Sequence, residues 1–211
     1  MSMKDRYSTD GFTEDMYEPG SDNKVLKNKL GINNIQEMNE AELNSLLKAM
    51  HTVVELYDET HRFTASDICK IHKIWLGDIY DWAGQYRSVN ISKGDFTFAM
   101  SMHVPDLMQD FEPGLLKELT PCQFSKPNEI IHAIAVVHTE LVLIHPFREG
   151  NGRLARILST LMGLQAGVPP LEFACLDGKL KERYFHAVQE GLKCNYRPME
   201  EIFKTVLESS F

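Results

Sequence analysis

Residues 127–156 read PNEIIHAIAVVHTELVLIHPFREGNGRLAR, and this stretch sets the centre of the fold. Its first part, 127–144, begins with proline and is apolar on most sides of a helix, which predicts a buried core helix. Pro146 disfavours continued helix at His145, so a loop is expected to begin there. Periodicity resumes after the glycines and predicts a second helix over 153–165. The chain therefore centres on two helices joined by a glycine-rich loop.

Apolar residues spaced three and four apart predict further helices on both sides of this centre. Thr64, with Asp67 three residues later, is a loose capping box that opens one of them. In chain order, we expect helices over residues 23–30, 34–58, 64–81, 105–119, 127–144, 153–165, 179–194 and 198–209.

A different pattern lies between these helices, where residues 89–100 read VNISKGDFTFAM. β-Branched and aromatic residues on both sides of Lys93-Gly94-Asp95 predict a small β-hairpin. The fold class is therefore all-α, with about eight helices around a central apolar helix and one small hairpin. Residues 1–22 are polar and lack periodicity, so we expect an N-terminal arm followed by a single domain over 23–211.

Composition narrows the class of protein. The 211 residues suffice for one compact domain, with 43% hydrophobic and 25% charged residues. A net charge of −8 disfavours direct binding to nucleic acid, because phosphates need a basic surface. The four cysteines are scattered, as in a reducing compartment, and neither a signal peptide nor a run of about 18 apolar residues is present. We therefore expect a cytoplasmic protein without a membrane partner.

The segment from His145 to Arg156 combines residue types that suit phosphate chemistry. His145 lies where the loop begins and can act as a base. The glycines and the N-terminus of the following helix offer N–H groups and a favourable dipole to an anion. Arg153 and Arg156 are three residues apart on one helical face, and Glu149 adds one carboxylate of the kind that holds Mg²⁺ beside phosphates. These groups are those needed for phosphoryl or nucleotidyl transfer.

This segment resembles the signature of the Fic (filamentation induced by cAMP) family, HxFx(D/E)GNGRxxR. All eight specified positions match, namely His145, Phe147, Glu149, Gly150, Asn151, Gly152, Arg153 and Arg156. The stretches 17–30 and 79–87 (IYDWAGQYR) are also similar to small bacterial cell-filamentation proteins of this family. The resemblance covers roughly residues 17–203 and implies the Fic fold.

The resemblance implies transfer of AMP from ATP to a hydroxyl side chain of a target protein. It implies that His145 is the general base and that Glu149 holds Mg²⁺. The phosphate groups would be bound by Gly150, Asn151, Gly152, Arg153 and Arg156, with Arg153 on the β-phosphate side and Arg156 at the γ-phosphate. The hairpin resembles the flap that docks the target by strand addition, formed by Ile91, Ser92, Lys93, Gly94, Asp95, Phe96, Thr97 and Phe98.

Many Fic proteins carry an inhibitory helix with the motif (S/T)xxxE(G/N), and this chain lacks that motif. The nearest match is HAVQEG at 186–191, where histidine replaces serine or threonine. The chain thus resembles toxin-type Fic proteins that are inhibited by a separate antitoxin chain. Relatives of this type modify bacterial type II topoisomerases, DNA gyrase and topoisomerase IV, which makes these the expected targets.

Alternatives remain open at this point. The chain could transfer a γ-phosphate, as the related Doc toxins do, another nucleotide or phosphocholine, or it could be a catalytically silent binding module. The two glycines, Gly150 and Gly152, favour AMP transfer, because Doc-type kinases have larger residues near these positions. His132, His138 and His145 are six and seven residues apart, whereas a helical metal pair prefers three or four. Tyr184 is interpreted as a core residue, with stacking on adenine as the alternative.

Overall fold

The computed structural model describes residues 13–176 and 178–210. In chain order the α-helices of this part are α1 (Ile35–Leu56), α2 (Ala65–Leu76), α3 (Val104–Phe111), α4 (Lys117–Leu119), α5 (Pro127–Ile144), α6 (Asn151–Gln165), α7 (Gly178–Gly191) and α8 (Arg197–Ser209). The strands β1 (Ser92–Lys93) and β2 (Phe96–Thr97) form an antiparallel hairpin, with Ser92 opposite Thr97. The predicted class, all-α with one small hairpin, is confirmed.

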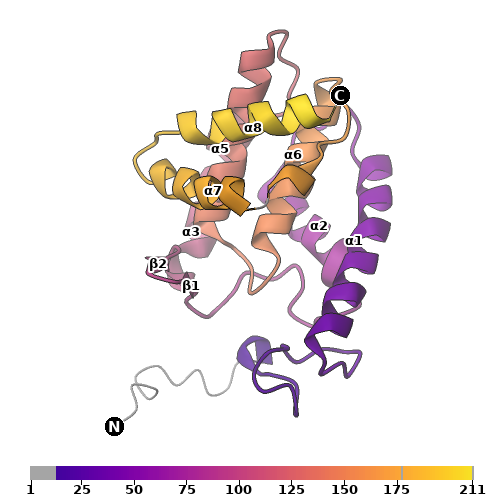
Figure 1. Cartoon of the computed structure of the whole chain (residues 1–211). Helices are drawn as coiled ribbons and strands as arrows, with labels where there is room; N and C mark the ends of the chain where they lie inside the picture. The colour runs from indigo at the N-terminus through magenta and orange to yellow at the C-terminus, as the bar shows by residue number, and fades with distance from the viewer. Residues whose placement is uncertain (1–12, 177, 211) are drawn as a thin grey trace.

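Helix α5 lies at the centre, beside α6, with α7 and α8 on one side and α1 and α2 on the other (Figure 1). Ala133, Ile134 and Leu141 are fully buried on it. By length and composition α5 could also cross a membrane, and 67% of it is buried inside the fold. This burial is that of a core helix, as its all-round apolar pattern predicts.

The start of α2 follows the predicted capping box. The Thr64 hydroxyl accepts the Asp67 N–H at 3.1 Å, and the Asp67 carboxylate accepts the Thr64 N–H at 2.9 Å. The helix ends at Leu76, earlier than expected, because the Leu76 carbonyl accepts both the Ile79 and the Tyr80 N–H groups and closes a turn.

The helix predicted over 23–30 is wrong. Tyr17 and Leu26 instead form an antiparallel bridge, and Asp22 and Asn23 have positive φ angles of 54° and 57°. Asn28 bonds to neighbouring backbone through its side chain, including the Leu26 carbonyl at 3.0 Å. Such local bonds compete with helical ones. The predicted boundary at residue 22 stays a prediction, and residues 1–12 of the expected arm lie outside the described residues.

The helix predicted over 105–119 is interrupted. Between α3 and α4, residues Glu112–Leu116 form a wider π-helical segment in which Gly114 leaves helical geometry, with φ −84° and ψ −105°. Pro113 contributes no N–H and clashes with the preceding turn, which accounts for the kink.

Candidate active site

The loop between α5 and α6 begins and ends in left-handed backbone. His145 has φ 52° and Gly150 has φ 84°. A Cβ at Gly150 would lie 2.7 Å from a ring carbon of Trp75, so a side chain is excluded there by space as well as by φ. A Cβ at Gly152 would meet nothing within 4 Å. Gly150 therefore lets the loop pack closely against Trp75, whereas Gly152 faces open space near the start of α6.

Two sets of contacts fix the conformation of the loop. Phe147 is fully buried and stacks on His72, with ring centroids 3.9 Å apart. The Asn151 side chain accepts the Phe147 N–H at 2.8 Å and donates to the Phe147 carbonyl at 2.7 Å. The side-chain amide of Asn151 is thus used to hold the loop. Because Asn151 is the first residue of α6, its backbone N–H is free of helical bonds and suited to an anion.

His145 is arranged as a base. Its Nδ1 lies 3.0 Å from the Val142 carbonyl, which can only accept, so Nδ1 is the donor and Nε2 holds the lone pair. The ring stacks on Phe98 of the hairpin at 3.6 Å. Burial lowers the pKa of His145 to about 4, with repulsion from Arg87 in the same direction. The imidazole is therefore neutral near pH 7 and can accept a proton.

Arg87 is a site residue that the sequence analysis missed. Its side chain is fully buried and donates to the carbonyls of His145 at 2.6 Å, Val89 at 2.7 Å and Ala99 at 2.5 Å. These acceptors belong to the catalytic loop and to both ends of the hairpin segment. The arginine in the stretch IYDWAGQYR was the only sequence signal, and no local pattern gives it this role.

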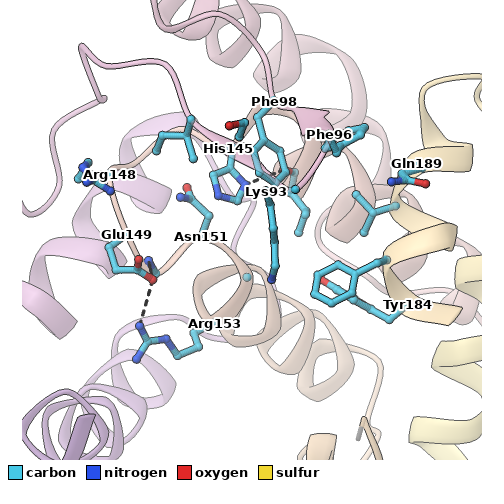
Figure 2. A pocket seen from close by; sticks show the side chains of 18 of the residues that line it. Lys93, Phe96, Phe98, His145, Arg148, Glu149, Asn151, Arg153, Tyr184 and Gln189 are labelled. Carbon is cyan, nitrogen blue, oxygen red and sulfur yellow. Dashed lines mark hydrogen bonds and ion pairs between the residues drawn. The ribbon is translucent and has the colours of Figure 1, made fainter. Parts of the chain in front are cut away.

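Glu149 and Arg153 form an ion pair at 3.4 Å, drawn as a dashed line in Figure 2. Arg153 is paired more closely with Glu42 of α1, at 2.6 Å, and lies 4.7 Å over the Trp75 ring. Glu42 is buried and also accepts the Tyr80 hydroxyl at 2.7 Å. Glu42 was not predicted as a site residue. It ties the first motif arginine to α1.

Arg156 lies in different surroundings. Its Nε is buried and has no hydrogen-bond partner among the described residues. Its guanidinium lies 5.5 Å from the Phe173 ring and 5.9 Å from the Tyr184 ring. A buried donor without a partner is costly, and no carboxylate pairs with this guanidinium among the described residues. Arg156 also lines the cavity, so its guanidinium is available to a bound anion.

A cavity of about 710 Å³ brings these groups together. It contains every predicted catalytic, metal and phosphate residue, namely His145, Glu149, Gly150, Asn151, Gly152, Arg153 and Arg156. The hairpin supplies Ile91, Ser92, Lys93, Gly94, Phe96 and Phe98, whereas Asp95 and Thr97 do not line it. Tyr184 of α7 lines the opposite wall and is also a buried core residue (Figure 2).

The histidines on α5 have protein partners. Within residues 13–176 and 178–210, no group of three or more His, Cys, Asp or Glu could hold a metal ion. His132 pairs with Glu200 at 2.7 Å, and His138 is buried against Ser159 and Tyr184. Glu149 fits Mg²⁺ in another way. It is a half-exposed carboxylate on the cavity wall, suited to an ion whose other ligands are phosphate and water.

Known proteins similar to this chain carry the family name that the motif indicates. Residues 62–162 match the model of the Fic/DOC family. The chain is 34% identical over 174 residues to "Protein adenylyltransferase Fic" of Nematostella vectensis, covering 79% of this chain but only 38% of that protein. It is 30% identical over 193 residues to "Probable protein adenylyltransferase Fic" of Salmonella typhimurium, covering 88% of this chain and 89% of that protein.

Among solved structures, the chain is similar to the N-terminal Fic domain of a VirB-translocated effector protein from Bartonella quintana, determined with bound ADP. The TM-score is 0.67 at 26% identity, over 86% of this chain and 89% of that one. Family model, full-length relative and fold therefore agree with the twelve-residue motif, and the chain belongs to the Fic/DOC family.

Proposed function

We propose that this chain is a protein adenylyltransferase that transfers AMP from ATP to a hydroxyl side chain of a target protein. The observation that carries this proposal is the shared cavity. It places a neutral histidine, with its lone pair on Nε2, beside a helix N-terminus and the unpartnered Nε of Arg156. A base and an anion site within one cavity suit attack of a hydroxyl on a phosphate.

In the proposed reaction, Nε2 of His145 takes the proton of the target hydroxyl while its oxygen bonds to the α-phosphorus. The bond from the α-phosphorus to the bridging oxygen breaks, and diphosphate leaves. The first N–H groups of α6 and the guanidinium of Arg156 stabilise the phosphate oxygens. Mg²⁺, held by Glu149, would neutralise charge on the leaving group.

The open space at Gly152 supports AMP transfer over γ-phosphate transfer. No atom lies within 4 Å of a Cβ built there, so a side chain at this position would occupy open space at the cavity that Gly152 lines. The glycine leaves this space for the α- and β-phosphates.

The test uses purified protein, Mg²⁺ and bacterial lysate, with ATP labelled at either the α- or the γ-phosphate. We expect label on a protein band from α-labelled ATP only, and none with His145→Ala. Label from γ-labelled ATP only would mean phosphate transfer instead. Undiminished labelling by the His145→Ala protein would refute the base assignment.

The target and the regulation are part of the proposal. We propose a cytoplasmic toxin-type protein that modifies type II topoisomerases and is inhibited by an antitoxin chain whose carboxylate pairs with Arg156. The lack of an (S/T)xxxE(G/N) motif and the unpartnered Nε of Arg156 support this. Expression of the chain alone should slow bacterial growth and label gyrase or topoisomerase IV subunits, whereas harmless expression of active enzyme would argue against a toxin.

A further inference from the structure

Lys93, at the end of β1, points into the cavity and not toward the outer side of the hairpin. Figure 2 shows its side chain reaching down between the Glu149 side of the cavity and the Tyr184 side. Its Nζ lies 4.0 Å from the centroid of the Phe185 ring on α7. Asp95, the other charged residue of the turn, does not line the cavity. The hairpin thus directs its cation inward.

The surroundings of Lys93 are rich in positive charge. Burial lowers the pKa of Lys93, and so does repulsion from Lys181 and Arg156, while attraction to Glu149 opposes this. Within the described part of the chain, Lys93 has no ion pair within 4.0 Å, and Nε of Arg156 has no hydrogen-bond partner. The cavity is lined by Lys93, Arg148, Arg153 and Arg156 but by one carboxylate, Glu149. Such an excess of cations over anions indicates a site for an anionic ligand.

Resting on the proposed function, we infer that Lys93 is a phosphate-binding residue of the nucleotide site, which exchanges its contact with Phe185 for the phosphate chain of ATP, opposite Arg156. A cation over a half-buried phenylalanine ring at the surface is held weakly, whereas an ammonium–phosphate hydrogen bond between two charged groups is stronger. The exchange is therefore favourable when a phosphate chain fills the cavity.

The hairpin would then act in nucleotide binding as well as in target docking. Lys93 belongs to the same short hairpin as Phe98, which stacks on His145. A lysine bound to phosphate would hold this hairpin over the cavity, so ATP would prepare the surface on which the target docks.

The experiment measures binding without any target. Calorimetry with the full chain compares a non-hydrolysable ATP analogue (AMPPNP) with adenosine. We expect Lys93→Met to bind the analogue about 10- to 100-fold more weakly and adenosine within about twofold of wild type. Lys93→Arg should restore most of the affinity. Lys181→Met removes the same charge from α7 outside the cavity lining and should stay within about twofold of wild type.

Three outcomes would overturn the inference. Equal AMPPNP affinity of Lys93→Met and wild type would remove Lys93 from the phosphate site. Equal loss for AMPPNP and adenosine would mean general damage to the cavity. Normal AMPPNP affinity with lost target labelling would make Lys93 a docking residue only. Failure of the proposed function itself is distinguishable, because wild type would then transfer no α-label.

Discussion

The two arginines of the motif stand three residues apart on α6 and have opposite surroundings. Arg153 contacts two carboxylates, Glu42 at 2.6 Å and Glu149 at 3.4 Å. Arg156 lies among aromatic rings, and its buried Nε has no partner among the described residues. The same residue type in one short motif therefore does two jobs. Arg153 joins α6 to α1, whereas Arg156 is left for a ligand.

The surroundings of Arg153 also change the role expected for it from the sequence. The family resemblance implies phosphate contacts for both arginines, and both line the cavity. A phosphate that approached Arg153 would have to compete with Glu42 and Glu149 for the same guanidinium. We therefore expect substitutions near Arg153 to act mainly on stability and substitutions of Arg156 to act mainly on catalysis.

The largest expected effect is on stability. Glu42→Ala leaves Arg153 without its closest carboxylate and Tyr80 without its acceptor, so the free energy of unfolding should fall by about 3 kcal/mol. Denaturant unfolding measures this. Glu40→Ala, on the exposed side of the same helix, is the matched control and should change little. Equal stability of the two variants would show that the Glu42–Arg153 pair anchors nothing.

Arg156→Ala should lower kcat/KM for ATP by about 100-fold, because one or two charge-assisted hydrogen bonds to phosphate are lost. Steady-state labelling at varied ATP concentrations measures this loss. Arg183→Ala removes an exposed arginine from α7 and should leave kcat/KM within about twofold. Unchanged kinetics in Arg156→Ala would exclude it from ATP binding, and the contrast between the two motif arginines would lose its functional meaning.

A smaller effect is expected from Tyr184→Phe. This change keeps the ring beside Arg156 and removes the hydroxyl that lies 2.9 Å from Nε2 of buried His138. The free energy of unfolding should fall by about 1 kcal/mol, while KM for ATP stays the same. A large rise in KM would mean that the hydroxyl, and not the ring, keeps Arg156 in place.

The smallest expected effect concerns pH. The base form of His145 is neutral, and its pKa is lowered to about 4, so kcat/KM should fall only as pH decreases toward 4. Between pH 8 and pH 5.5 the loss should stay below about twofold, whereas an ordinary histidine with a pKa near 6.5 would lose about tenfold. The profile should keep its shape in Arg156→Ala, because burial, Arg87 and Lys93 lower this pKa and Arg156 does not. An acid limb near pH 6.5 would contradict the buried-base geometry.

The sequence predicted the loop between α5 and α6 because its determinants are local. Eight motif positions lie within twelve residues, and the proline and glycines fix where helix gives way to loop. His72, Arg87 and Glu42 were missed because their contacts with the site span 77, 58 and 111 residues of chain. Such pairs are set by how helices pack. The helix predicted over 23–30 is wrong for a local reason. The Asn28 side chain bonds to nearby backbone in place of helical hydrogen bonds.

The buried Arg87 side chain fixes the position of the hairpin relative to His145. One rigid guanidinium joins the His145 carbonyl to Val89 and Ala99, which flank the hairpin. The hairpin and His145 are therefore held by the same side chain. Under the proposed function, a target peptide that paired with the hairpin would present its hydroxyl to His145 at a distance set by the Arg87 contacts, whatever its sequence elsewhere.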